Sequence, residues 1–500
     1  MPKRALISVS DKTGVAEFAK RLIAAGYEII STGGTLKTIS DAGIAVTAVD
    51  DVTGFPECFG GRVKTMHPKI MGGVLFRRGE DDADAKKMEI EPIDLVVVNL
   101  YPFEESVAKG ITGDELIKQI DIGGPTLLRS AAKNKNYVTV VCDVADYDRV
   151  MEQIEKDGDT SLELRSELAV KVFERTMAYD ATITKALSGA EKGGILVRNR
   201  MELRYGENPH QQGYYYDLYE YDRAWKVIQE EKQMSYLNIL DADGAWNLVC
   251  EYEEPTAACI KHANPSGVAS HDDIAEAFQR CYDADRLSAF GVIVALNRPC
   301  TAEVIQKIID QKIFAEVIIA PGYEPEALKL LKKRPKLRAI EMSCPEEKNP
   351  MTARSMLGGM LIQEQDTKVL TKDDLTVVTD AKPTDAQIED LLFTWVVVKN
   401  AKSNAIVFAK DKVTTGIGCG QTSRVDSTII AARRAGDKAK GSVMASDAFF
   451  PFADSIEEAA KNGITAIIQP GGSIRDEEVI AKANELGIVM VTTGIRAFRH

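Results

Sequence analysis

A lysine and a histidine stand side by side where a short apolar segment ends. Residues 257–260 are apolar and are followed directly by Lys261 and His262. A histidine can act as a general base near neutral pH, and a lysine can stabilise an oxyanion as it develops. The alternative is a lysine whose alkyl chain covers apolar surface and a histidine that bonds only to a backbone carbonyl.

A strand and a turn must position this pair. The apolar run predicts a buried strand, and the Asn-Pro-Ser-Gly sequence at 264–267 predicts a turn, because proline disfavours helix at the residue before it. Lys261 and His262 are therefore expected at the carboxyl end of a strand. In open α/β sheets this is the edge that binds ligands.

The composition limits the classes of protein. The chain has 500 residues, of which 45% are hydrophobic and 27% charged, as in ordinary globular proteins of several domains. Its apolar runs are much shorter than the ~20 residues of a membrane span, and residues 1–12 lack a signal-peptide core. We therefore expect a cytoplasmic protein with no membrane contact. The net charge of −13 offers no general attraction for nucleic acid, so the expected partners are small molecules.

The cysteines indicate reduced thiols. Eight of them are scattered along the chain without a C-x-x-C pair. This pattern argues against a disulfide framework and against a structural zinc site. We expect no catalytic metal.

The N-terminal region begins with a βαβ pattern. Strands are predicted at 5–9 and 27–30, with a helix at 15–25 between them. Each strand runs into a small polar loop: the loops carry Ser10, Lys12, Thr32, Gly33, Gly34 and Thr35. Hydroxyl groups and glycines at helix N-termini bind phosphate through backbone N–H groups, although helix capping by serine or threonine is the alternative.

Three further segments of this region carry polar groups that could form a site. They are a basic loop at 60–69 with Arg62, Lys64 and Thr65, a strand at 95–98 that leads to Asn99 and Tyr101, and a loop with Asp121 and Gly123. The last loop opens a helix on which Arg129 and Lys133 share one face. The basic loop does not have the glycine spacing of a P-loop, and a solvated run of charges is the alternative.

A long helix is predicted at 162–187, and the glycine-rich residues 188–194 predict a domain boundary. Beyond it, strands and helices alternate again. The segments 317–322 and 466–471 are similar, which predicts a duplicated α/β unit. The glycine run at 416–424 fails the G-x-G-x-x-G pattern and disfavours a dinucleotide site.

Several motifs, taken in order, resemble one family along nearly the whole chain. They are Ser-Val-Ser-Asp-Lys-Thr-Gly (8–14), Gly-Gly-Arg-Val-Lys-Thr (60–65), Asn-Leu-Tyr-Pro-Phe (99–103), Arg-Tyr-Gly-Glu-Asn-Pro-His (204–210), Lys-His-Ala-Asn-Pro (261–265) and Ser-Asp-Ala-Phe-Phe-Pro-Phe (446–452). The sequence is similar to the bifunctional purine-biosynthesis enzymes that join an AICAR transformylase to an IMP cyclohydrolase.

The resemblance implies an α/β fold, two activities and a homodimer. Residues 1–190 would form a methylglyoxal-synthase-like domain with a parallel sheet, the IMP cyclohydrolase. Residues 195–500 would form the transformylase from two cytidine-deaminase-like α/β units that meet at about 350–380. The co-substrate would be 10-formyltetrahydrofolate, and AICAR, formyl-AICAR and IMP would be the other small-molecule ligands.

The resemblance also assigns site residues. The cyclohydrolase would bind nucleotide through Ser10, Lys12, Thr32, Gly33, Gly34, Thr35 and Arg62, and would surround the closing ring with Lys64, Thr65, Asn99, Tyr101, Asp121, Gly123 and Lys133. The transformylase would use Arg204, Tyr205, Gly291, Asn404, Arg424 and Arg496 for nucleotide, Asp447, Gly471 and Gly472 on the folate side, and Lys261 with His262 for catalysis. Two positions differ from the family pattern. Met71 stands where relatives commonly carry a histidine, and Ala497 stands where several carry a larger residue.

Elementary chemistry agrees with these roles. Formyl transfer to a weakly nucleophilic aromatic amine needs a base with a pKa near neutrality, such as His262, and a cation such as Lys261. Ring closure is intramolecular, so positioning should dominate, with Lys64, Lys133, Tyr101 and Asp121 as oxyanion donors and proton carriers.

Two other functions fit parts of the sequence. A non-catalytic nucleotide sensor would explain the phosphate-binding loops but would not need His262. A zinc nucleoside deaminase would share the implied fold, but the H-x-E and P-C-x-x-C ligand patterns are missing.

Overall fold

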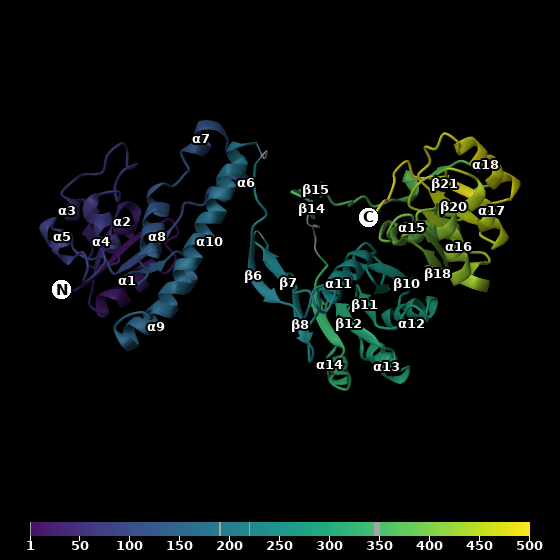
Figure 1. The fold of residues 1–500 in the computed structure, drawn as a ribbon, viewed down its shortest axis with the longest axis horizontal. Helices are drawn as coiled ribbons and strands as arrows, with labels where there is room; N and C mark the ends of the chain where they lie inside the picture. Colours follow the sequence, from purple (N-terminus) through teal and green to yellow (C-terminus); the bar gives the residue numbers. More distant parts are fainter. Residues whose placement is uncertain (1, 190–191, 220, 345–350) are drawn as a thin grey trace. The chain divides into compact units, whose positions relative to one another are not determined.

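The computed structural model describes residues 2–189, 192–219, 221–344 and 351–500 (Figure 1). The chain divides into two compact units, Met1–Leu196 and Val197–His500. The domain edge predicted at residue 190 lies outside the described residues. Residues 345–350, at the start of the region where the two deaminase-like units are predicted to meet, also lie outside them. In the described ranges no helix has the length and apolar character that a membrane crossing requires.

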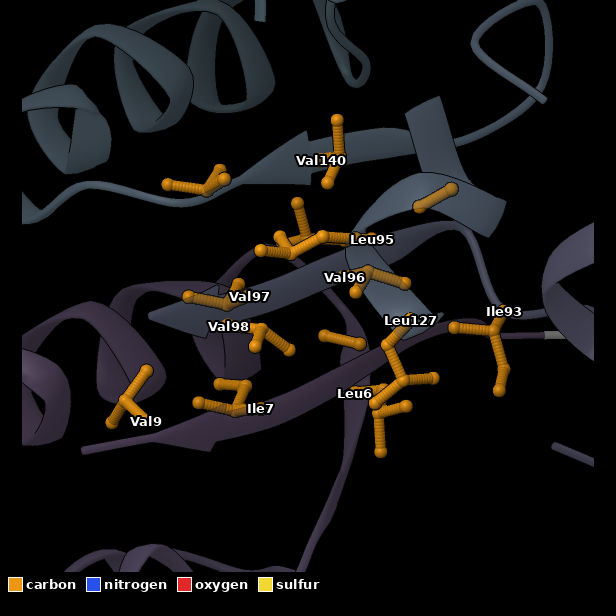
Figure 2. Packing of buried hydrophobic residues seen from close by; sticks show 14 of the residues in the cluster. Leu6, Ile7, Val9, Ile93, Leu95, Val96, Val97, Val98, Leu127 and Val140 are labelled. Atoms are coloured by element: carbon orange, nitrogen blue, oxygen red, sulfur yellow. The ribbon is translucent and has the colours of Figure 1, made fainter. Parts of the chain in front are cut away.

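The first unit is built on a parallel sheet. Its five strands have the order β3-β2-β1-β4-β5, and every neighbouring pair is parallel. The strands are β1 (Lys3–Val9), β2 (Tyr27–Ser31), β3 (Thr47–Ala48), β4 (Leu95–Asn99) and β5 (Thr139–Val141). The consecutive apolar residues 5–7 of β1 and 95–98 of β4 are buried, so both faces of these strands are covered, as Figure 2 shows for labelled side chains of both strands with Val140 and Leu127. The predicted parallel-sheet domain is confirmed.

The helices of this unit cover the sheet. They are α1 (Val15–Ala24), α2 (Gly33–Asp41), α3 (Val49–Thr53), α4 (Pro68–Leu75), α5 (Asp82–Lys87), α6 (Phe103–Ala108), α7 (Gly113–Ile117), α8 (Gly123–Lys133), η1 (Val144–Asp146), α9 (Tyr147–Asp157) and α10 (Leu162–Leu187). The long predicted helix is confirmed as α10. Ser161 starts it by accepting a hydrogen bond from the N–H of Leu164. Both α8 and α10 contact β5, and α10 packs along α8.

The second unit is built on a mixed sheet of twelve strands in the order β16-β21-β20-β19-β17-β18-β10-β9-β11-β12-β13-β8. These strands are β8 (Trp225–Gln229), β9 (Thr256–Lys261), β10 (Asn264–Ser270), β11 (Val292–Leu296), β12 (Ala315–Ala320), β13 (Arg338–Met342), β16 (Thr376–Val377), β17 (Ile406–Lys410), β18 (Val413–Gly418), β19 (Val443–Ser446), β20 (Ala466–Gln469) and β21 (Val489–Thr492). Two separate hairpins pair β6 (Val197–Glu202) with β7 (Tyr214–Leu218), and β14 (Met351–Met356) with β15 (Gly359–Glu364).

The helices of the second unit alternate with these strands. They are α11 (Tyr236–Val249), α12 (Ile274–Ala284), α13 (Ala302–Asp310), α14 (Pro325–Leu331), η2 (Lys372–Asp374), α15 (Asp385–Lys399), α16 (Arg424–Ala435), η3 (Gly436–Ala439), α17 (Asp454–Lys461) and α18 (Asp476–Glu485).

The large sheet repeats one pattern outward from its centre. On one side an antiparallel hairpin, β9–β10, is followed by β11, β12 and β13 in parallel. On the other side the hairpin β17–β18 is followed by β19, β20 and β21 in parallel. The similar segments at 317–322 and 466–471 contain the equivalent strands β12 and β20. The topology therefore confirms the predicted duplication.

The turn predicted at 264–267 is wrong. Asn264 is the first residue of β10, and the turn is made by His262 and Ala263, whose φ angles of 58° and 55° are left-handed. Pro265 is tolerated because it lies near the start of the strand, beside an irregularity in the pairing between Pro265 and Gly267.

The expectation of reduced cysteines throughout is also wrong. Cys250, which caps the end of α11, forms a disulfide with Cys344, just beyond β13, with 5.7 Å between their Cα atoms. The two cysteines are 94 residues apart in sequence and meet only through the fold, so short-range spacing carries no signal for them. The other six cysteines are free.

Candidate active sites

The first unit contains a cavity of about 690 Å³ at the carboxyl ends of β1, β2 and β4. Nearly all residues assigned to ring closure line it. These are Ser10, Lys12, Thr32, Gly33, Gly34, Thr35, Arg62, Lys64, Thr65, Asn99, Tyr101, Asp121 and Gly123. Lys133 is not among the lining residues. It is the last residue of α8, and a rise of 1.5 Å per residue places it about 15 Å along the axis from Gly123.

Asn99 joins two of the loops that form the cavity. Its Oδ1 accepts hydrogen bonds from the backbone N–H groups of Ser10 and Asp11, at 2.5 and 2.9 Å, and its Nδ2 donates to the carbonyl of Asp11. Thr35 is held differently, since its hydroxyl bonds to both backbone groups of Val9 and its side chain is buried. Thr35 therefore fixes the end of β1 to α2, and the hydrogen of its hydroxyl is already donated to Val9.

Cationic side chains surround the start of α2. Lys12 Nζ donates to the carbonyl of Ser10 at 3.1 Å, and a Cβ atom on Gly34 would lie 3.4 Å from Lys12 Cε. Lys64 Nζ forms an ion pair with Glu57 at 2.7 Å. A Cβ on Gly61, whose φ is +86°, would lie only 2.7 Å from Lys64 Cε. The glycines thus allow the lysines to lie close to the backbone at a helix N-terminus, the arrangement that binds phosphate.

Asp121 lies at the start of α8 and is strongly constrained. Its Oδ1 accepts a hydrogen bond of 2.9 Å from the N–H of Gly124, and its own N–H donates to the Tyr179 hydroxyl at 2.8 Å. A Cβ on Gly124 would lie 2.3 Å from Asp121 Oδ2, so a larger residue there would displace the carboxylate. Burial raises the pKa of Asp121, which makes this carboxyl a better proton carrier than an exposed one. Tyr101 is 56% exposed.

Sequence reasoning missed two residues of this site. Glu57 pairs with Lys64 from an irregular loop, and Tyr179 reaches Asp121 from the middle of α10. Neither residue belongs to a recognisable motif.

Met71, which stands where the family commonly has a histidine, lies on α4 and packs against the apolar core of the unit.

In the second unit, one group of assigned residues surrounds the turn between β9 and β10. Lys261 Nζ donates to the carbonyl of Phe290 and lies 5.8 Å from the centre of its ring. Gly291 follows Phe290 with a φ of +75°. The side chain of His262 is exposed, whereas its backbone N–H points to Asp241 on α11.

Arg204 and Tyr205 lie at the N-terminal end of α11. The N–H of Arg204 donates to the carbonyl of Met234, and the carbonyl of Tyr205 accepts from the N–H of Tyr236. The Arg204 guanidinium lies 4.9 Å from the centre of the Tyr205 ring. The same helix therefore supports these two residues and the His262 turn.

A second group of assigned residues lines a cavity of about 440 Å³. Its walls carry Asn404, Arg424, Arg496, Phe449, Phe452 and Phe498. Arg424 is buried and donates to Asn404 Oδ1 at 2.7 Å and to Asp447. Asp447 has no exposed surface and also accepts from the N–H of Ala405, so it holds Arg424 from behind.

The turn at Gly471 and Gly472 does not line this cavity. The N–H of Gly472 donates to Asp476 at the start of α18. Ala497 is buried, and its N–H bonds to the carbonyl of Asp447, which fixes the segment that carries Arg496.

One hydrogen bond joins the two groups. Asn264 Oδ1 accepts from the N–H of Lys402 at 2.9 Å, which holds the turn with Lys261 and His262 against the loop that leads to Asn404. The turn with the predicted base and cation thus contacts the loop that leads to Asn404, which lines the cavity with arginines and aromatic rings.

Comparisons with known proteins show the family of this chain. The family model described as AICARFT/IMPCHase bienzyme matches residues 131–434, and the MGS-like domain matches residues 14–126. The bifunctional purine biosynthesis protein PurH of Anoxybacillus flavithermus is 48% identical over 515 residues, and that of Listeria welshimeri is 49% identical over 513 residues, each with 100% of both chains covered. The crystal structure of ForH matches 37% of this chain and 98% of its own, at 35% identity and a TM-score of 0.34. The full-length similarity and the match over more than half of the chain show that this protein belongs to the AICARFT/IMPCHase bienzyme family.

Proposed function

We propose that the two units divide the two activities of the family between them. The chain catalyses the last two steps of IMP synthesis, formyl transfer to AICAR and dehydrative closure of formyl-AICAR to IMP. The observation that carries the division is the cavity of about 690 Å³, which lies wholly in the first unit and gathers almost every residue assigned to ring closure.

In the first unit, ring closure follows from the positions of the lining groups. The nucleotide phosphate would bind the N-terminus of α2 with Lys12 and Arg62. The carboxamide nitrogen then attacks the formyl carbon, and the new C–N bond leaves an oxyanion that Lys64 can stabilise. Loss of one water molecule completes the ring, with Asp121 as the nearby proton carrier. Because the reacting atoms belong to one molecule, holding them in place supplies much of the acceleration.

In the second unit, we assign formyl transfer to the His262 turn and the adjoining cavity. The amine of AICAR attacks the formyl carbon of 10-formyltetrahydrofolate, His262 takes the amine proton, and Lys261 stabilises the oxyanion. The C–N bond to the folate then breaks, and tetrahydrofolate leaves with a proton. Arg424 and Arg496 offer cations to anionic groups of the ligands, and the phenylalanine rings offer apolar surface to their flat rings.

The division is tested with one variant in each unit, assayed for both reactions. His262→Ala should lower formyl transfer by about 10²-fold or more, the usual contribution of a positioned base, and leave closure of supplied formyl-AICAR unchanged. Lys64→Ala should lower the rate of ring closure and leave formyl transfer unchanged. Near-normal transfer by His262→Ala, or loss of both activities in either folded variant, would refute the assignment.

We also propose the homodimer that the resemblance implies. In the hairpin β14–β15 every residue of both strands is exposed, and Ala353, Met360 and Ile362 lie on one face. A two-stranded hairpin is marginally stable alone in water, so a second copy is the expected cover for this face. Light scattering should give about twice the chain mass of 54.7 kDa, and Ile362→Lys should weaken the dimer. A monomer at micromolar concentration would refute the proposal.

A cytoplasmic location, expected from the sequence, remains part of this proposal. Thiols are normally reduced in that compartment. The fraction of Cys250 and Cys344 that is disulfide-bonded in the cell should therefore be measured.

A further inference from the structure

The turn that carries the proposed catalytic base has a backbone that its own residues do not favour. Two-residue hairpin turns with both φ angles positive normally use Asn-Gly or Asp-Gly. Here the two positions are His262 and Ala263, with φ angles of 58° and 55°. Both side chains have a Cβ atom, which is disfavoured in the left-handed region. Something outside the turn must therefore hold it.

Asp241 makes the contacts that can do so. This residue lies one turn into α11 and is only 7% exposed. Its Oδ1 accepts a hydrogen bond of 2.8 Å from the N–H of Ala263, and its Oδ2 accepts one of 3.3 Å from the N–H of His262. Two consecutive N–H groups thus bind the two oxygens of one carboxylate, and these two bonds stabilise the turn in its left-handed conformation.

The support behind Asp241 is rigid. Ser235 caps the start of α11 together with Asn238, in a reciprocal pair of hydrogen bonds. Asn238 in turn donates to Glu316 at 2.8 Å. On the far side of the turn, Asn264 accepts from Lys402. The His262 turn is therefore fixed between a capped helix and the loop next to the arginine-lined cavity.

We propose that Asp241 is a positioning residue for formyl transfer, which holds the His262–Ala263 turn left-handed and thereby fixes where the imidazole lies. The inference rests on the proposed role of His262. Asp241 itself touches no reacting atom; it acts through the backbone of the base.

The test uses the change Asp241→Asn in the full-length protein. An asparagine offers one oxygen, so one of the two N–H groups would face an amide NH₂. We expect kcat for formyl transfer to fall by about tenfold or more, because a partly buried N–H loses its acceptor and the turn is no longer held at both positions. The KM for AICAR and the cyclisation rate should stay close to their normal values. Asp243→Asn is the matched control, since Asp243 is exposed on the same helix two residues further on.

Two double variants separate positioning from general damage. In Asp241→Asn with Ala263→Gly, part of the lost kcat should return, because glycine adopts a positive φ without a Cβ penalty. In Asp241→Asn with His262→Ala, the losses should not add, because both changes remove the same contribution.

The outcomes distinguish this inference from the proposed function. If His262→Ala transfers the formyl group normally, the role of His262 fails, and the inference fails with it. If His262→Ala is inactive in transfer while Asp241→Asn is normal, only the positioning role of Asp241 is overturned. Fully additive losses, or a rise in the KM for AICAR without a change in kcat, would likewise overturn it.

Discussion

The hydroxyl of Tyr179 accepts a hydrogen bond of 2.8 Å from the backbone N–H of Asp121. The same hydroxyl donates to the carbonyl of Gln119 at 3.4 Å. Tyr179 is buried in the middle of α10, and none of the residues of α10 lines the cavity of the first unit. The long helix therefore fixes the loop that carries Asp121 from outside the cavity lining.

Tyr179→Phe should slow ring closure without affecting formyl transfer. The change removes one hydroxyl and keeps the ring, whose edge packs against Phe103. Loss of a buried hydrogen bond of this kind costs about 1 kcal/mol, which corresponds to about a fivefold lower kcat if the energy is felt at Asp121. Tyr27→Phe is the control, since Tyr27 is buried at the opposite, amino end of β2. Unchanged cyclisation by Tyr179→Phe would contradict the positioning role.

The pH dependence of ring closure should report Asp121. Burial raises the pKa of this carboxyl above its ordinary value, and hydrogen bonds from backbone N–H groups such as that of Gly124 oppose the shift. If the ionised carboxylate carries the proton, kcat/KM falls as the pH drops through this raised pKa. The acid limb should therefore lie at higher pH than for an exposed aspartate, and it should disappear in Asp121→Asn. A profile with the same acid limb in both proteins would contradict this role.

The carboxyl-edge cavity could be predicted because its signals are local. Parallel strands end at a common edge, so polar residues after β1, β2 and β4 had to meet there. Lys133 lies at the end of α8 and is absent from the cavity lining, so its role in ring closure stays a prediction.

The remaining features depend on contacts that leave no motif in the sequence. Asp241 with the His262 turn, Glu57 with Lys64, and Cys250 with Cys344 each join parts of the chain that no motif connects. The Asn-Pro sequence was a misleading turn signal for a related reason. Pro265 lies near the start of a strand, beside an irregularity in the pairing, where the strand does not need a backbone N–H donor. The sequence does not show which strand pairs with this segment.

The disulfide can be detected by counting reactive thiols before and after reduction. Protein purified without reductant should show six reactive cysteines after denaturation, and two more after reduction. Reduction should lower the free energy of unfolding by about 2–4 kcal/mol, because the bond closes a long loop. Cys344→Ser should match the reduced protein in stability and should not change on reduction. Eight reactive thiols without reductant would contradict the bond.

Removal of metal should leave both activities intact. The sequence lacks the H-x-E and P-C-x-x-C ligand patterns of zinc deaminases, and the described residues contain no cluster of three or more His, Cys, Asp or Glu side chains suited to a metal ion. Prolonged dialysis against EDTA, checked by elemental analysis, should not change formyl transfer or cyclisation. Loss of transfer that zinc restores would contradict this expectation.

The first unit should close the ring on its own. Its apolar core draws only on residues before the end of α10, and a domain of nearly 200 residues can bury a stable core. Every residue of its cavity also lies before Thr139, the start of β5. A fragment of residues 1–196 should therefore fold cooperatively and convert formyl-AICAR to IMP at a rate close to that of the whole chain.

The complementary fragment separates two kinds of failure. Residues 197–500 carry the His262 turn, the adjoining cavity and the hairpin proposed as the dimer contact, so they should dimerise and transfer the formyl group. If the folded first fragment binds IMP but does not form it, the ring-closing site needs groups from the second unit. The division of labour would then be wrong, although the division of the fold would stand.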